Sequence, residues 1–128
     1  EWEKAARGTD GRTYPWGEEI SCTYANYYDG SKYCVGDTAP VGSYSDGASI
    51  YGALDMAGNV WEWVSSLYKD YPYDENDGRE DLTASGSRVL RGGSWNSSGS
   101  YVRSASRNGD GPTSSGSNLG FRCSLSHP

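Results

Sequence analysis

Few side chains in this sequence could support redox, metal or acid–base chemistry. The cysteines stand at positions 22, 34 and 123, and the one histidine is His127. The sequence contains neither a Cys-x-x-Cys pair nor a Cys/His cluster, so the spacing typical of a zinc site is missing. A single imidazole beside the end of the chain argues against catalysis by a histidine base. Cys22 and Cys34 could pair and leave Cys123 as a buried thiol, or all three could stay reduced; the odd count fits both arrangements.

Charge is distributed unevenly along the chain. The net charge is −6, yet residues 88–128 contain five arginines and one acidic residue, Asp110. Nucleic-acid binding requires a concentrated Lys/Arg surface. Because these arginines fall at strand-like positions in an acidic chain, we expect no nucleic-acid partner. No apolar run approaches the roughly 20 residues that cross a bilayer, so we expect no membrane insertion. No signal peptide is visible, and no cellular location follows.

Composition and patterning predict one small, loop-rich domain with an aromatic core. The 128 residues include 11 Tyr, 5 Trp and 18 Gly, and each large aromatic ring can bury about 150–250 Å². Residues 1–7 favour a helix that Gly8 would end. We expect structured loop over residues 8–50 and a solvated acidic loop over 70–87. Alternating apolar and polar residues predict strands at 60–64, 88–92, 101–105 and 120–125.

Six ordered motifs resemble a single protein family. They are Glu1-Trp2-Glu3-Lys4-Ala5-Ala6-Arg7-Gly8, Tyr14-Pro15-Trp16-Gly17, Ala39-Pro40-Val41-Gly42-Ser43, the run from Asp55 to Trp63, Arg88-Val89-Leu90-Arg91-Gly92-Gly93-Ser94-Trp95, and Asn118-Leu119-Gly120-Phe121-Arg122-Cys123. Together they resemble the formylglycine-generating-enzyme (sulfatase-modifying factor) domain. The resemblance implies an α+β, irregular and loop-rich C-type lectin-like fold with short antiparallel strands and few helices. It also implies one domain over residues 1–128, equivalent to about the C-terminal half of the family domain.

The catalytic residues of that family are missing here. Its oxidising enzymes carry copper-binding cysteines just after the Gly-Gly-Ser-aromatic motif, whereas residues 95–104 contain no cysteine. Cuprous ions require soft thiolate ligands, which serine and asparagine do not replace. The sulfoxide-synthase members use a histidine cluster, and this chain has one histidine. The resemblance therefore predicts a protein without enzymatic activity and without copper.

The C-terminal motifs also resemble the variable region of proteins diversified by retroelements. This second resemblance implies a variable region over residues 88–128. In such regions the adenines of asparagine codons are mutated, which cannot produce Lys, Glu, Gln, Trp or Met, and residues 96–126 contain none of these five. The alternative is an ordinary Ser/Gly-rich loop of an inactive family member, which would also lack these residues at times.

Our candidate ligand-binding residues are those between the fixed motifs whose residue type a mutated asparagine codon can encode. They are Asn96, Ser97, Ser98, Ser100, Tyr101, Ser106, Asn108, Gly109, Asp110, Gly111, Ser114, Ser115, Gly116, Ser117 and Asn118. Free variation is tolerated on exposed loops that a rigid scaffold holds, so we expect these side chains to face solvent together. Tyr101 is the one aromatic residue among them. The expected buried anchors between them are Trp95, Val102, Ala105, Leu119, Phe121 and Cys123.

The first resemblance also implies a structural calcium site. Asp55-x-x-Gly58-x-Val60-x-Glu62 matches a calcium site of the enzyme family. Asp55 and Glu62 would provide carboxylate oxygens, and Gly58 and Val60 would provide backbone carbonyls. Calcium takes six to eight oxygen ligands, so water or further carbonyls would complete the shell. The alternative is that Glu62 forms an ion pair instead, for example with Arg91.

Taken together, the sequence predicts a ligand-binding protein with a retroelement-diversified surface. We expect its ligand to be a protein on a host or neighbouring cell. The alternative is a catalytically inactive sulfatase-modifying-factor-like domain with a fixed partner or a structural role.

Overall fold

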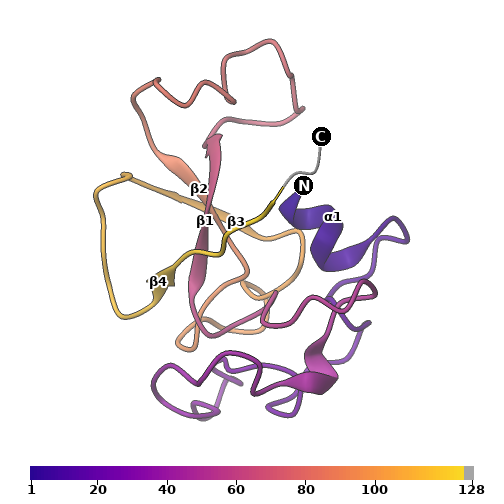
Figure 1. Ribbon diagram of the computed structural model, residues 1–128. Helices are drawn as coiled ribbons and strands as arrows, with labels where there is room; N and C mark the ends of the chain where they lie inside the picture. Colours follow the sequence, from indigo (N-terminus) through magenta and orange to yellow (C-terminus); the bar gives the residue numbers. More distant parts are fainter. Residues whose placement is uncertain (126–128) are drawn as a thin grey trace.

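The computed structural model describes residues 1–125, in which two short helices and four short strands are embedded in loops (Figure 1). His127 lies outside the described residues. None of the helices in this part of the chain has the length and apolar character needed to cross a membrane. The elements are α1 (Trp2–Arg7), the 3-10 helix η1 (Ser45–Gly47), β1 (Trp61–Leu67), β2 (Arg88–Arg91), β3 (Arg107–Asp110) and β4 (Leu119–Gly120).

The N-terminal helix forms where the sequence predicts it. α1 ends at Gly8, whose φ of 70° lies in the left-handed region that glycine adopts readily. Side chains at the start of α1 reach the sheet. The indole nitrogen of Trp2 donates to the Glu62 carboxylate at 2.6 Å, and Glu3 pairs with Arg91 at 2.9 Å. The helix is thereby fixed against β1 and β2.

The four strands form one mixed sheet in the order β3-β2-β1-β4. β1 pairs with β2, and β2 with β3, in antiparallel fashion, whereas β4 runs parallel to β1. The predicted short antiparallel strands are therefore confirmed, and β4 adds a parallel strand that the prediction did not include. A long connection brings the chain back to the free edge of β1 in the same direction, and parallel pairing needs such a crossover.

The predicted strand at residues 101–105 does not form. Val102 and Ser104 are fully buried while the residues beside them are exposed, so the alternation in the sequence does reflect burial. This segment has no ladder partner and consists of turns. The backbone N–H of Ser104 donates instead to the carbonyl oxygen of Thr13 at 2.9 Å. The strand that completes the antiparallel part of the sheet is β3, a few residues further along.

The predicted strand at residues 120–125 is reduced to the two residues of β4. After Gly120 the chain leaves the sheet, and Phe121 and Leu125 are 76% and 91% exposed. Cys123 is an exposed free thiol. The expected burial of Phe121 and Cys123 is therefore wrong, because no described segment covers this part of the chain.

The core is small and aromatic, as the composition predicts. Its buried residues include Tyr14, Tyr27 and Val102. Trp16 packs against this cluster and stacks on Tyr14 at 5.6 Å and on Tyr24 at 5.2 Å between ring centroids. Offset stacking of this kind adds to the free energy gained from burial alone. These aromatic residues hold loops that contain no regular secondary structure.

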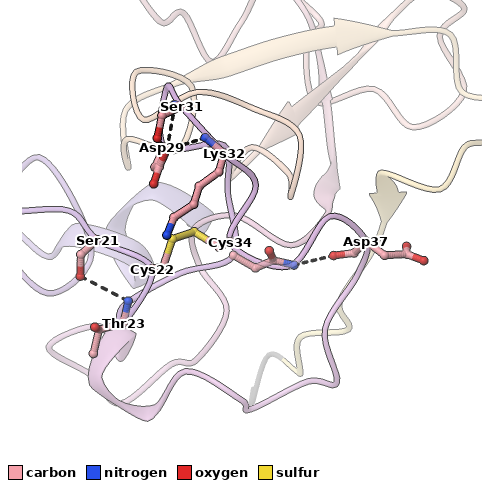
Figure 2. Close-up of a disulfide and its surroundings, with 9 residues drawn as sticks. Ser21, Cys22, Thr23, Asp29, Ser31, Lys32, Cys34 and Asp37 are labelled. Carbon is pink, nitrogen blue, oxygen red and sulfur yellow. Dashed lines mark hydrogen bonds between the residues drawn. A yellow bond between two sulfur atoms is a disulfide. The ribbon is translucent and has the colours of Figure 1, made fainter.

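A disulfide joins Cys22 to Cys34 and closes the loop between them (Figure 2). Cys123 is a free cysteine. At the tip of this loop, a carboxylate oxygen of Asp29 accepts hydrogen bonds from the backbone N–H groups of Ser31 and Lys32 at 2.9 Å. Both half-cystines pack against the aromatic core. The structure thus has the Cys22–Cys34 pair that the sequence allowed, but the third thiol, Cys123, is exposed rather than buried.

Candidate functional site

The segment that follows β2 begins with a tight, closely packed turn. Gly93 has a φ of 71°, and a Cβ at this position would lie 2.6 Å from the Val102 side chain. Ser94 is fully buried, and its hydroxyl contacts Asn96 Oδ1 at 2.7 Å and Ser97 Oγ at 2.9 Å. The fixed Gly-Gly-Ser motif therefore has a structural role: it brings the backbone against Val102 and sets the direction of the residues after it.

Loops from the first third of the chain hold the backbone of residues 96–100 in place. The N–H of Tyr28 donates to the carbonyl of Ser97 at 2.9 Å, next to an isolated parallel bridge between Tyr28 and Ser98. The hydroxyl of Tyr14 donates to the carbonyl of Gly99 at 3.2 Å. These contacts use main-chain atoms of the candidate segment. Changes of its side chains leave these main-chain bonds in place, although the side chains of Asn96 and Ser97 also contact the buried Ser94.

None of the fifteen candidate ligand-binding residues is buried. The exposed ones are Asn96, Ser100, Tyr101, Asn108, Ser115, Gly116 and Ser117. The half-buried ones are Ser97, Ser98, Ser106, Gly109, Asp110, Gly111, Ser114 and Asn118. Fully buried residues alternate with them at Ser94, Val102 and Ser104.

Two tryptophans bring separate parts of the candidate surface together. The indole N–H of Trp95 donates to the carbonyl of Ser117 at 3.4 Å, and the Trp61 N–H donates to the carbonyl of Asn118 at 2.8 Å. The Trp61 ring also meets Tyr101 edge-on at 6.5 Å. Residues 96–101 and 117–118 therefore lie together. The β3 positions 108–110 lie at the opposite edge of the sheet from β4, and residues 111–118 connect the two edges (Figure 1).

The expected buried anchors are only partly confirmed. Val102 is fully buried, and Trp95 and Leu119 are half-buried. Ala105 is exposed, like Phe121 and Cys123. The serines at 94 and 104 fill interior positions instead, which an alternation of apolar residues cannot reveal.

Sequence reasoning missed aromatic residues that border the candidate surface. Tyr33, which is 51% exposed, meets Trp95 edge-on at 5.6 Å and Tyr28 at 5.0 Å. At the β3 edge, the Arg107 guanidinium lies over the ring of Tyr71 at 4.2 Å. Tyr101 is therefore not the only aromatic side chain beside the variable positions. Nothing in the local sequence links these tyrosines to residues 96–118, because they come from loops far away in the chain.

The predicted calcium ligands make other contacts in the described structure. Glu62 is 5% exposed, and both of its carboxylate oxygens accept hydrogen bonds from Arg122 Nε at 2.8 Å. The Arg122 Nη2 group also donates to the main-chain carbonyl of Asp55 at 3.0 Å. The Asp55 carboxylate itself accepts a hydrogen bond from the Gly42 N–H at 2.7 Å. Arg122, rather than the suggested Arg91, is the partner of Glu62.

This donor set does not fit a calcium shell in the described arrangement. The Arg122 guanidinium contacts both oxygens of the Glu62 carboxylate, one of the two carboxylates predicted to bind calcium, so a cation would have to displace it. No group of three or more His, Cys, Asp or Glu side chains in residues 1–125 is placed to hold a metal ion. Arg122 provides the positive charge beside the Glu62 carboxylate in this arrangement.

Calcium is accordingly expected to leave thermal stability unchanged. With Arg122 in place, the melting temperature in millimolar calcium chloride should match that in EDTA to within about 1 °C, because a ligand stabilises only if it binds the folded state. Differential scanning calorimetry measures the difference, and magnesium chloride at equal ionic strength controls for salt. A rise of several degrees with calcium alone would restore the calcium prediction for Asp55, Gly58, Val60 and Glu62.

The sequence matches the sulfatase-modifying factor enzyme 1-like domain over residues 1–126. It is 42% identical over 129 residues to serine/threonine-protein kinase Pkn1 of Chlamydia trachomatis, and this alignment covers 96% of the present chain and 20% of the kinase. It is 37% identical over 140 residues to inactive C-alpha-formylglycine-generating enzyme 2 of Mus musculus, which covers 98% of this chain and 41% of that protein. The chain thus spans less than half the length of these curated relatives.

Solved structures confirm the type of fold. Treponema denticola variable protein 1 superimposes with a TM-score of 0.76 and 32% identity, over 94% of this chain and 43% of that one. PvdO from Pseudomonas aeruginosa superimposes with a TM-score of 0.71 and 31% identity, over 94% of this chain and 48% of that one. The loop-rich C-type lectin-like architecture with few helices and short strands is therefore confirmed, and so is the resemblance to a variable protein.

Proposed function

The chain belongs to the sulfatase-modifying factor enzyme 1-like domain family, and we propose that it is a non-catalytic, ligand-binding member with a retroelement-diversified surface. The surface comprises the fifteen candidate residues between Asn96 and Asn118. Its ligand is a protein exposed on a host or neighbouring cell.

The observation that carries this proposal is the separation of fixed and variable positions by burial. None of the fifteen candidate residues is buried, while the neighbouring residues Ser94, Val102 and Ser104 are fully buried. A protein can vary without unfolding only at positions that contribute little to the core. Small polar residues and tyrosine also form adaptable contacts with low conformational-entropy cost, as in antibody loops.

The relatives support a role in binding rather than catalysis. One of them is named an inactive enzyme, and one matched structure is named a variable protein. Other relatives are named as enzymes, among them formylglycine-generating enzyme of Mus musculus. The cysteines and histidines that the chemistry of those enzymes needs are missing from residues 95–104 of this chain.

The DNA beside the gene provides the direct test of diversification. We expect a reverse-transcriptase gene nearby, together with a near-copy of the last hundred or so coding bases that differs only at adenines. If neither is present, the proposal of diversification is wrong and the inactive-domain alternative takes its place.

A second test measures how much substitution the surface tolerates. Ser100, Asn108, Ser115 and Ser117 are exposed, and tyrosine is one of the residues that a mutated asparagine codon can encode. Changing all four to tyrosine is expected to alter the free energy of unfolding by no more than about 1 kcal/mol, because exposed side chains contribute little to stability. Urea denaturation followed by tryptophan fluorescence measures the difference.

Ser104→Tyr is the matched control for that experiment. Ser104 lies in the same segment but is fully buried, so the same change should overpack the interior and cost about 2 kcal/mol or more. If the fourfold surface variant lost as much stability as this single buried one, the candidate positions would contribute to the core and the proposed surface would be wrong.

A further inference from the structure

A partly enclosed hollow of about 250 Å³ lies where α1, the loop after it and the segment between β2 and β3 meet. Three arginines line it, one from each of these parts: Arg7, Arg12 and Arg103. Thr13 and Ser106 contribute to the same walls. Ser106 is one of the candidate ligand-binding residues, so the hollow adjoins the proposed recognition surface.

Arg103 contributes a positive charge that no acidic side chain in residues 1–125 neutralises. Its Nε group donates to the carbonyl of Ser100 at 2.8 Å, which fixes the base of the guanidinium. None of the ion pairs among the described residues includes Arg103. The outer Nη groups are the part of the guanidinium that forms paired hydrogen bonds with a planar or tetrahedral oxyanion.

The other arginines around the hollow are only partly neutralised. Glu3 pairs with Arg7 at 2.6 Å through one oxygen and with Arg91 at 2.9 Å through the other, so one carboxylate serves two cations. Arg91 also donates to the carbonyls of Ala105 and Ser106 and therefore lies against the back of this wall.

Near the junction of α1 and the loop after it, carboxylates accompany the arginine Arg12. Arg12 pairs with Asp10 at 2.5 Å, and this contact lowers the pKa of Asp10 to about 2. Glu18 accepts hydrogen bonds from the backbone N–H and the hydroxyl of Thr13 at 3.1 and 2.6 Å. The lining of the hollow itself contains three arginines and no carboxylate, in a chain whose net charge is −6. The hollow is locally positive on an acidic protein.

We propose that this hollow binds an oxyanion of the ligand, a carboxylate, sulfate or phosphate group, with Arg103 as its principal contact. An anion placed there reduces the mutual repulsion of Arg7 and Arg103 and adds charge-assisted hydrogen bonds. The long-range field of an acidic chain repels anions, so binding at this position depends on local contacts. The inference rests on the proposed function only for its statement that the group belongs to the ligand.

NMR titration of the full chain with sodium sulfate, sodium phosphate and sodium acetate tests the proposal. Ionic strength is held constant with sodium chloride, and the Nε–H signals of arginine are followed. We expect a saturable shift of the Arg103 signal with at least one of the three anions and none with chloride exchange alone. The order of the three dissociation constants distinguishes a carboxylate from a sulfate or phosphate ligand group.

Matched variants localise the binding. Arg103→Gln is expected to raise the dissociation constant about fivefold or more, since it removes charge-assisted hydrogen bonds at an exposed position. Arg103→Lys retains the charge and should have a smaller effect. Lys4→Gln is the control, because Lys4 is an exposed cation on α1 outside the lining of the hollow. It should leave the dissociation constant unchanged.

The proposal is overturned if no anion gives a saturable shift, or if Lys4→Gln and Arg103→Gln weaken binding equally. This outcome is distinct from failure of the proposed function. Absence of a reverse transcriptase beside the gene refutes diversification and leaves the anion titration unaffected. A negative titration removes the hollow from the recognition surface and leaves the test of diversification unaffected.

Discussion

Alanine in place of Gly58 is expected to lower the free energy of unfolding by about 4 kcal/mol or more, a large part of the total for a domain. Gly58 has a φ of 74°, and a Cβ there would lie 2.3 Å from the carbonyl oxygen of Asn26. That oxygen accepts the Asn59 N–H at 2.8 Å, and the Gly58 N–H donates to Gly92 at 2.8 Å. The backbone around Asn26 and the backbone around Gly58 cannot move apart without loss of these hydrogen bonds. Chemical denaturation followed by tryptophan fluorescence measures the change.

Gly52→Ala separates the two causes of that loss. Gly52 has a similar φ of 78°, but no atom lies within 4 Å of the position that a Cβ would occupy. This control should therefore cost only the strain of a left-handed conformation, about 1–2 kcal/mol. If Gly58→Ala cost no more than Gly52→Ala, the close approach of residues 26 and 58 would not be a constraint on the fold.

The second large effect is expected from Glu62→Gln. The Glu62 carboxylate is buried and accepts hydrogen bonds from the Trp2 indole at 2.6 Å and from Arg122 Nε at 2.8 Å. Glutamine has nearly the same shape but leaves the Arg122 guanidinium without its counter-charge. Removing one partner of a buried pair costs about 3–5 kcal/mol. We expect a loss of about 3 kcal/mol, because the Arg122 side chain is 35% exposed and water screens it in part.

A matched exposed pair provides the control for this variant. Asp10 also forms a two-oxygen contact with an arginine, Arg12, but its side chain is 53% exposed. Asp10→Asn should change stability little, because water screens the pair. A double-mutant cycle of Glu62→Gln with Arg122→Gln then isolates the interaction itself. If the two carboxylate variants had equal effects, burial would not be the reason for the importance of Glu62.

Gly58 and Glu62 stabilise the scaffold through contacts that lie outside the candidate ligand-binding positions. Gly58 and Glu62 join the N-terminal loops, α1 and the end of the chain through backbone contact and buried charge. None of these contacts uses the side chain of a candidate ligand-binding residue. These two stabilising residues are therefore separate from the proposed recognition surface, as a diversified surface requires.

Local features were predictable because neighbouring residues determine them. The helix at residues 2–7 with its glycine end, and the strands at 61–67 and 88–91, follow from propensity and alternation within a few positions. The small aromatic core follows from composition. The predicted strand at 101–105 failed because burial alternates there without a partner strand, and alternation in a sequence reports burial rather than pairing.

Contacts between distant segments were not predictable in the same way. Glu62 and Arg122 are sixty positions apart in the chain. The sequence alone could not show that Glu62 pairs with Arg122 while Arg91 pairs with Glu3. Tyr33 meets Trp95, and Arg7 and Arg103 line the same hollow, only because loops without a repeating pattern are folded together. Loop paths depend on many weak contacts that no short motif encodes.

The sequence alone indicated the family, the missing cysteines and histidines and the candidate variable positions, because these are statements about which residue types are present. The tertiary structure decided which of those positions are exposed, which cation neutralises Glu62 and where unneutralised arginines gather. Burial and electrostatic pairing are properties of distance in space, and distance between remote residues is fixed only when the whole chain has folded.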